Sequence, residues 1–202
     1  MKIIAISGSP RNKATQHVAE VALASIKEKY PDMETELISL KGKKVEPCTA
    51  CDYCKRKKDW CIIKDDANDM IKEIVTADGI LMLSPVYVME PTPQLMALFS
   101  RMRPLHHVYQ DITRHKLGAS IAVGGTRNGG QEIAVNTMNN LLLARGINVV
   151  SNEAFGYHGG KVWSKDQGAA GVDADEIGMK TAIQVAQKLA EMVSLVCKGK
   201  EE

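Results

Sequence analysis

Residues 2–15 read "KIIAISGSPRNKAT", an apolar run that ends at a Gly-Ser-Pro turn. The apolar run at 2–7 is continuous and rich in β-branched side chains, which is typical of a strand buried on both faces. After the turn, apolar residues recur at helical spacing through 15–30, so a helix is predicted there. A buried strand that leads through a short loop into a helix is the repeating unit of a parallel α/β sheet.

The same unit recurs along the rest of the chain. Further apolar runs predict strands at 35–40, 79–84, 117–123 and 147–150. Periodic segments between and after them predict helices at 65–77, 92–105, 131–144 and 175–197. Asp66 is the expected N-cap of the first of these helices, and Thr92 with Pro93 opens the second as cap and first-turn proline. Residues 151–174 are expected to form a long loop.

Five strands alternating with helices imply one parallel sheet with right-handed crossovers. A chain of 202 residues suits a single domain of this kind, and the sequence contains no internal repeat. Ligands of such sheets bind beyond the carboxyl ends of the strands. Distinctive loops follow three of the predicted strands, at 7–15, 84–92 and 124–130. We therefore expect these loops to converge on one site.

The first loop is rich in groups that bind anions. It offers the hydroxyls of Ser7, Ser9 and Thr15, the guanidinium of Arg11 and the free amides of a helix N-terminus. It lacks the Gly-Lys-Ser/Thr ending of a Walker A loop and the G-x-G-x-x-G spacing of a Rossmann site. The loop therefore predicts a monophosphate site, and the alternative is an ordinary turn capped by Thr15.

The other two loops predict a surface for a flat ring system. "SPVYVMEPTP" (84–93) places Tyr87 among apolar residues directly after a central strand. "GGTRNGG" (124–130) has four glycines, which let a ligand approach the backbone closely. A phosphate at one end and a planar ring at the other describe FMN. The alternative for Val86, Tyr87 and Met89 is packing at a subunit contact.

Four of the five cysteines lie in "CTACDYCKRKKDWC" (48–61), at C-x2-C-x2-C-x6-C spacing. No secretory signal peptide or membrane-length apolar run is evident, so we expect a cytoplasmic protein whose thiols stay reduced. Iron-sulfur clusters use C-x2-C-x2-C runs, although one cluster on all four cysteines requires a turn at 55–60. Zinc also accepts four cysteines, and unliganded thiols are the third alternative.

Charge and motifs narrow the function classes further. The net charge of +2 does not indicate a nucleic-acid partner. No Ser-His-Asp order and no H-E-x-x-H motif indicates a hydrolase, so no catalytic acid or base is assigned. The basic run at 55–58 is either a solvated face or a docking site for an acidic partner. It would also offset the negative charge of a thiolate-bound cluster.

The segments "GSPR", "SPVY", "AVGGTRNGG" and "CIIKDD" (61–66), together with the cysteine spacing, resemble the iron-sulfur flavoprotein branch of the flavodoxin-like NADPH-dependent FMN reductase superfamily. The resemblance covers nearly the whole chain. It implies a flavodoxin-like three-layer sandwich whose five-stranded parallel sheet has the order 2-1-3-4-5. It also implies a single domain over residues 1–202, with a cysteine-rich insertion (cysteine loop 42–64) after the second strand.

Carried over position by position, the resemblance also implies the site residues. The implied contacts of FMN are Ser9, Arg11, Thr15 and Gln16 at the phosphate, and Pro85, Val86, Tyr87, Val88, Gly124, Gly125, Thr126 and Gly130 along the isoalloxazine. The implied ligands of a [4Fe–4S] cluster are Cys48, Cys51, Cys54 and Cys61. Many relatives have an aromatic residue where this chain has Val88.

The implied function is electron transfer from reduced ferredoxin through the cluster and FMN to oxygen, peroxide or another small acceptor, in a homodimer or homotetramer. Ferredoxin would dock on the basic face of Lys55, Arg56, Lys57 and Lys58. One alternative is an NAD(P)H-dependent FMN or quinone reductase without a cluster. Another is a non-enzymatic flavin-binding protein whose cysteines form a thiol switch or a zinc site. Neither nucleic acid nor a membrane is expected as a partner.

Overall fold

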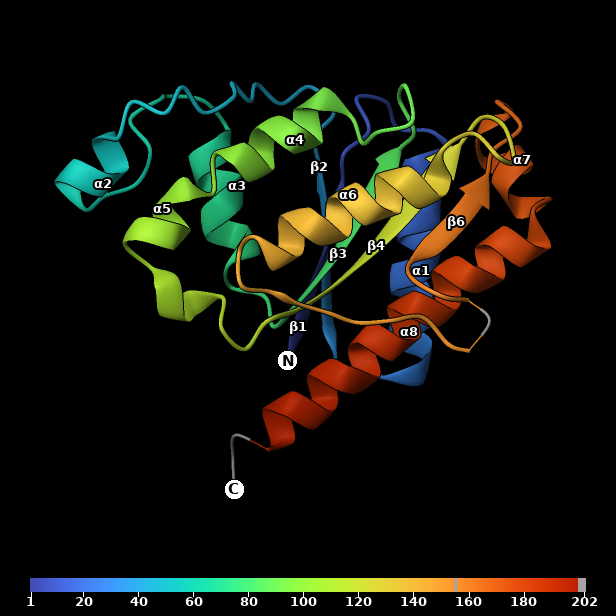
Figure 1. The fold of residues 1–202 in the computed structure, drawn as a ribbon. Helices are drawn as coiled ribbons and strands as arrows, with labels where there is room; N and C mark the ends of the chain where they lie inside the picture. The colour runs from blue at the N-terminus through green and yellow to red at the C-terminus, as the bar shows by residue number, and fades with distance from the viewer. Residues whose placement is uncertain (155, 200–202) are drawn as a thin grey trace.

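A parallel sheet lies at the centre of the molecule (Figure 1). The computed structural model describes residues 1–154 and 156–199. The strands stand in the order β2 (Glu34–Ser39), β1 (Lys2–Ser7), β3 (Gly79–Pro85), β4 (Leu117–Gly124) and β5 (Asn148–Val149), and each pairs with its neighbour in parallel. The predicted order 2-1-3-4-5 is confirmed.

The fifth position of the sheet is shared by two short strands. β5 pairs with the first residues of β4, whereas β6 (Gly160–Trp163) pairs with Ile121–Gly124 at the end of β4. The expectation of a structureless loop over 151–174 is therefore wrong, because that segment contains β6 and the helix α7 (Gly168–Asp173). The pairing arises from the open edge of β4, which no local sequence pattern reveals.

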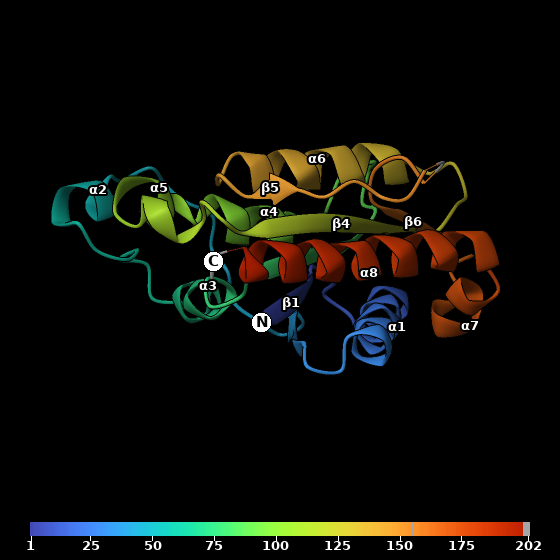
Figure 2. The ribbon, with the colours of Figure 1, turned by 90° about the horizontal axis from the view of Figure 1, so that it is seen from below.

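Helices cover both faces of the sheet (Figure 2). On one face, α1 (Ala14–Lys29) and α8 (Glu176–Lys198) share a core with the sheet. On the other face, α3 (Ala67–Ile74), α4 (Pro93–Ser100) and α6 (Gln131–Leu143) pack their apolar sides together. The predicted three-layer sandwich is confirmed, and the apolar side chains inside each layer account for the strand and helix periodicities.

The helix predicted over 92–105 is interrupted. α4 ends at Ser100, and a second short helix, α5 (Arg103–His107), follows. Pro104 causes the break, because proline has no N–H to donate and is tolerated only in the first turn of a helix. At the other end of α4 the prediction holds, since the Thr92 hydroxyl accepts a hydrogen bond from the amide of Leu95 at 3.3 Å.

Asp66 occupies the N-cap position of α3, but its side chain does not cap the helix. Its carboxylate instead accepts a hydrogen bond from the amide of Lys44 at 2.8 Å, and the neighbouring Asp65 accepts from the amide of Ala67 at 3.1 Å. Asp65 therefore binds the first amide of the helix in place of Asp66, because the carboxylate of Asp66 binds Lys44, which is distant in sequence.

The two ends of the molecule carry its small helices. α2 (Tyr53–Lys57) and α5 lie at one end and α7 at the other, in both views (Figures 1 and 2). A 3-10 turn, η1 (Gln110–Ile112), follows α5. Among the described residues, no helix is both long enough and apolar enough to cross a membrane.

Candidate functional site

The three predicted loops meet at the carboxyl edge of the sheet. The amide of Gly8 donates to the carbonyl of Leu83 at 2.8 Å, and the hydroxyl of Thr92 donates to the carbonyl of Gly8 at 2.6 Å. The amide of Val86 donates to the carbonyl of Val123 at 2.9 Å. Because β1, β3 and β4 are adjacent and parallel, their exits are neighbours, and the predicted convergence is confirmed.

The first loop has a shape set by Ser9 and leaves α1 without a side-chain cap. The Ser9 hydroxyl donates to the carbonyl of Arg11 at 2.7 Å and accepts from the amide of Arg11 at 3.1 Å, so it is used inside the loop. Thr15 is buried in the first turn of α1. Among the described residues no side chain caps α1 at Lys13. The amides of its first turn therefore remain available to an anion.

The second loop turns on two residues with left-handed backbone. Tyr87 and Glu90 exchange backbone hydrogen bonds at 2.8 and 2.9 Å, and Val88 and Met89 between them have φ of 50° and 67°. This conformation is costly for a β-branched residue. The side chain of Val88 gains no packing in return, because Val88 is 95% exposed.

The third loop holds the second one in place through Gly130. Gly130 has φ of +100°, and a Cβ on it would lie 2.7 Å from the Cα of Met89. Only glycine therefore fits this position. The side chain of Gln131 fixes the rest of the loop, since it donates to the carbonyl of Thr126 at 2.6 Å and accepts from the amide of Gly129 at 2.9 Å.

A fourth segment, 163–169, reaches the same edge and was not predicted. The indole of Trp163 donates to the carbonyl of Gly125 at 2.8 Å, and the amide of Ser164 donates to the carbonyl of Gly124 at 2.8 Å. An open hollow lies between this segment and residues 11–14 of the first loop. The only local signal was the short apolar pair in "KVW" before a turn, which is too short to indicate a strand.

The residues at this edge fit a phosphate-bearing planar cofactor. Besides the uncapped α1, two buried oxygens, Ser7 Oγ and Gln16 Oε1, have no hydrogen-bond partner among the described residues. Such orphaned acceptors are rare unless a ligand or water completes them. Pro85 is buried at the base of the second loop, Tyr87 is half-buried, and Arg11 is exposed beside the hollow.

The cysteine segment folds back on itself around α2. Asp52 and Lys58, which flank α2, both have left-handed backbone, and the carbonyl of Cys54 accepts the amide of Asp59 at 3.3 Å. This reversal is the predicted turn that returns the last cysteine. All four cysteines then line one small hollow: Cys48, Cys51, Cys54 and Cys61.

The thiols differ in their surroundings. Cys54 is buried, Cys51 is exposed, and Cys48 and Cys61 are half-buried. The backbone N–H of Tyr53 lowers the pKa of the Cys51 thiol, with help from Thr49 and Arg56. Within the described part of the chain, no group of three or more His, Cys, Asp or Glu side chains stands at metal-binding spacing. The thiols therefore surround the hollow without converging on one point.

Cationic side chains complete the wall of this hollow. The Nε of Arg101 donates to the sulfur of Cys61 at 3.2 Å, and Arg103 forms an ion pair with Asp52. Soft thiolate donors surrounded by positive charge are the donor set that iron-sulfur clusters and zinc use. The chemistry of the residues present therefore fits a four-thiolate metal centre.

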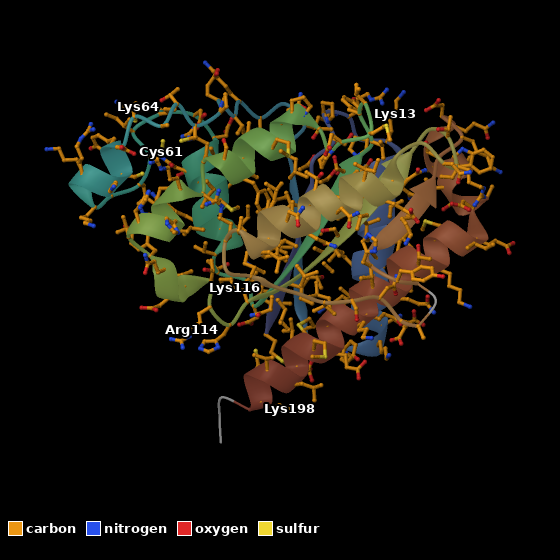
Figure 3. The ribbon with its side chains drawn as sticks, in the orientation of Figure 1. Lys13, Cys61, Lys64, Arg114, Lys116 and Lys198 are labelled. Atoms are coloured by element: carbon orange, nitrogen blue, oxygen red, sulfur yellow. The ribbon has the colours of Figure 1, made fainter. Side chains whose placement is uncertain are left out.

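One helix joins the two regions. The Thr92 cap at the start of α4 contacts the first loop, and Ser100 at its end accepts the amide of Cys48 at 3.0 Å through its hydroxyl. α4 has eight residues, which corresponds to about 12 Å. Figure 3 labels Lys13 in the first loop and Cys61 in the cysteine segment, on either side of this helix.

Comparisons with known proteins identify a family and a fold for this chain. The sequence pattern of the family described as NADPH-dependent FMN reductase matches residues 1–161. An iron-sulfur flavoprotein of Methanocaldococcus jannaschii is 38% identical over 96% of this chain and 97% of its own length. An iron-sulfur flavoprotein of Archaeoglobus fulgidus is 39% identical, over 95% and 96% of the two chains. Among solved structures, a WrbA-like flavodoxin from Agrobacterium tumefaciens has the same fold, with a TM-score of 0.65 at 15% identity, over 96% of this chain and 98% of that one.

Proposed function

Because the chain belongs to the NADPH-dependent FMN reductase family, we propose that it couples FMN to a [4Fe–4S] cluster held by the four clustered cysteines. The resemblance noted in the sequence is confirmed at the level of the family and its iron-sulfur flavoprotein relatives. The protein is a flavin-dependent oxidoreductase that transfers electrons. In the proposed reaction, electrons enter from ferredoxin and leave to a small acceptor such as oxygen or peroxide.

A single observation carries the proposal: the four cysteines line one hollow at the end of the helix whose other end borders the flavin loops. When bound, the cluster supplies one-electron transfer and FMN supplies the exchange with the acceptor. The chain's own residues bind and orient both groups. No acid or base is required of a side chain in one-electron steps, which agrees with the lack of a catalytic pair in the sequence.

The predicted contacts of FMN remain part of this proposal. The uncapped first turn of α1 and Arg11 would bind the phosphate, while Ser9 shapes the loop from within. Pro85 to Tyr87 and the glycines of 124–130 would border the ring. Val88 contributes its backbone, since its side chain is exposed.

The basic face is well placed to receive an acidic electron donor. Lys55, Arg56, Lys57 and Lys58 are all exposed on and directly after α2, which lies at one end of the molecule (Figure 1). Opposite charges steer such encounters, and salt screens them over about 8–10 Å. Ferredoxin docking here would therefore bring electrons next to Cys54.

The test begins with protein purified without oxygen, in which FMN, iron and acid-labile sulfide are measured together. The proposal expects about four irons per chain and flavin reduction by reduced ferredoxin. Charge reversal at Lys57 and Lys58 should slow that reduction at low salt and not at high salt. Lys198→Glu is the control, because Lys198 lies at the far end of α8 (Figure 3). FMN without iron would contradict the cluster.

A second candidate is an NAD(P)H-dependent FMN or quinone reductase without a cluster. It is favoured by the family description and by the spacing of the thiols, which do not converge on one point among the described residues. It predicts NADPH oxidation by iron-free protein at full rate. Iron in the purified protein together with no NADPH oxidation would exclude it.

The protein is further proposed to form a homodimer or homotetramer. Its supporting observation is apolar exposure beside the flavin loops, where Val88 is 95%, Met89 50% and Met96 37% exposed. Analytical ultracentrifugation tests this, and a monomer at micromolar concentration would contradict it.

A further inference from the structure

Arg101 is a completely buried charged residue beside the cysteines. It caps the end of α4, and its side chain has no exposed surface. Burying an isolated charge costs several kcal/mol, so a buried guanidinium needs an acceptor for its donors. The end of the helix does not itself require an arginine, because many residue types adopt the right-handed helical backbone that Arg101 has there. Its burial therefore indicates a role in what it contacts.

The acceptors of Arg101 come from both ends of the cysteine segment. Its Nη1 donates to the carbonyl of Glu46 at 3.0 Å, just before the first cysteine. Its Nε donates to Cys61 Sγ at 3.2 Å, and its Nη2 donates to the carbonyl of Ile63 at 3.1 Å. One planar side chain thus joins the start of the segment to its end, and this closure brings Cys61 to the hollow that Cys48 also lines.

Asp65 locks this arrangement. Its carboxylate, also without exposed surface, accepts from Arg101 Nη1 at 2.7 Å and from the amide of Glu46 at 2.8 Å. Glu46 is therefore held through its carbonyl by Arg101 and through its amide by Asp65. The carboxylate of Asp65 binds Nη1 of Arg101. Nε of Arg101 is directed at Cys61 Sγ instead, so a cationic N–H faces the sulfur of this cysteine.

The exposed cations contribute less positive charge at the cysteine sulfurs than Arg101 does. The basic run at 55–58 lies in solvent, where water and salt screen each charge. Arg103 is 28% exposed and pairs with Asp52. Hydrogen bonds and positive charge at the ligand sulfurs of a cluster raise its reduction potential, and the effect is strongest where water is excluded.

We propose that Arg101 is the positioning residue of the cysteine segment: it closes the segment around the hollow and supplies the buried positive charge that raises the reduction potential of a cluster held there. The inference rests on the proposed cluster at the four cysteines. Lysine cannot replace Arg101, because a single ammonium does not reproduce a planar group that binds Glu46, Cys61 and Ile63 together.

The test compares Arg101→Gln, Asp65→Asn and Arg101→Lys with the wild-type protein, all prepared without oxygen. Lys57→Gln is the control, since it removes a positive charge from the exposed face of the segment. Iron and sulfide per chain measure whether the cysteine segment closes around the hollow. FMN content and thermal unfolding measure whether the fold is intact. Redox titration of the iron-loaded fraction measures the reduction potential of the cluster.

Arg101→Gln and Asp65→Asn should shift the reduction potential of the cluster in opposite directions. Arg101→Gln should lower the equilibrium constant for electron uptake about tenfold, which is about 59 mV for one electron. Asp65→Asn leaves the guanidinium charge uncompensated and should raise this equilibrium constant, whereas Lys57→Gln should change it by less than about threefold. Arg101→Lys should bind less iron, while its loaded fraction keeps a potential closer to that of the wild type than Arg101→Gln does.

A merely structural role would not give shifts of opposite sign. Equal potentials in all variants, or shifts of Arg101→Gln and Asp65→Asn in the same direction, would overturn this inference and leave the proposed function standing. If Arg101→Gln fails to fold or to bind FMN, the comparison of Asp65→Asn with Lys57→Gln decides the question. A wild-type protein without iron would overturn the proposed function and this inference together.

Discussion

At the amino end of α4 the candidate flavin site is held by backbone hydrogen bonds between neighbouring strands and by side chains such as Thr92 and Gln131 that bind backbone, whereas at its carboxyl end the cysteine segment is held by a buried ion pair. The flavin loops are positioned by hydrogen bonds such as that from Gly8 to Leu83, which follow directly from the pairing of adjacent strands. In the part of the chain that the structure describes, the cysteine segment pairs with no strand. It depends on Arg101 and Asp65, whose side chains are completely buried.

The difference determines what each region tolerates. The flavin loops are limited by backbone space, because at Gly130 there is no room for a Cβ atom. The cysteine segment accepts residues with unusual backbone at Asp52 and Lys58, but it cannot lose one partner of its buried ion pair without leaving the other charge uncompensated. Each of the following experiments acts on one region and leaves the other unchanged.

The largest contrast is expected from Cys51→Ser. Loss of one thiolate should reduce the iron content from about four per chain to nearly none, while FMN content stays unchanged, because Cys51 lies in the cysteine hollow and not among the flavin loops. Iron and flavin are measured on the same sample. Cys197→Ser, in α8, is the control and should retain both. Loss of flavin along with iron would show that the two regions are not independent.

Asp65→Ala should destabilise the protein strongly. It leaves the buried guanidinium of Arg101 without its carboxylate, and removing one partner of a buried pair costs about 3–5 kcal/mol. Urea unfolding measures the change. Asp66→Ala is the matched control at the adjacent position, because Asp66 has a side chain that is 40% exposed and should cost about 1 kcal/mol or less. Equal costs for the two variants would contradict the importance of burial.

Gly130→Ala should act on the flavin region alone. The new Cβ would approach the Cα of Met89, in a backbone conformation with φ of +100°, at a cost of about 1–3 kcal/mol. We expect weaker FMN binding and unchanged iron content, measured by flavin fluorescence and iron assay. Gly42→Ala is the control, since Gly42 also has positive φ, at +72°, but open space around it. A similar loss of FMN affinity in both variants would show that the contact between the new Cβ atom and Met89 is not the cause.

Acid should weaken the cysteine region through Asp65. Burial raises the pKa of Asp65, but hydrogen bonds from Arg101 and from the amides of Glu46 and Ala67 outweigh burial and hold this pKa below its usual value of 3.8. Stability from this group is therefore complete above pH 3.8 and decreases as the pH falls through the lowered pKa, by about 1.4 kcal/mol per unit of depression. Unfolding free energies of wild type and Asp65→Asn should converge in that range, and parallel pH profiles would contradict the assignment.

The smallest effect is expected from relief of strain at Val88. Val88→Asn should stabilise the protein by about 1 kcal/mol, because asparagine tolerates positive φ better than a β-branched residue does. Val88→Ala is the control and should gain less. Thermal unfolding measures both. A destabilised Val88→Asn would mean that the side chain makes a contact in solution, such as one with another subunit.

The predicted strands and helices were largely confirmed where apolar runs and periodicity are strong, as at 2–7 and 131–144. The three loops were also predicted correctly, because parallel strands place their exits at one edge. β6 was missed since four residues paired to an open edge carry no periodic signal. Trp163, the last residue of β6, and Ser164, which follows it at the flavin edge, were missed with it.

Arg101 and Asp65 were missed for another reason. A charged residue within the apolar run "LMALFSRM" and the acidic pair after the last cysteine were visible signals. Neither signal indicates its partner, because the two residues are 36 positions apart and Arg101 is 40 positions from Cys61. The basic run at 55–58 was expected to offset the charge of a cluster, whereas the structure places the buried charge at Arg101.

By itself, the sequence determined the βα units, the order in which loops reach the edge of the sheet, and the thiol donors. These depend on local patterns: apolar periodicity, turn residues and cysteine spacing. Only the tertiary structure decided which residues close the cysteine segment and that a single helix, α4, separates it from the flavin loops. The physical reason is that burial of an ion pair and the packing of a helix end depend on residues distant in sequence, which only the folded chain brings together.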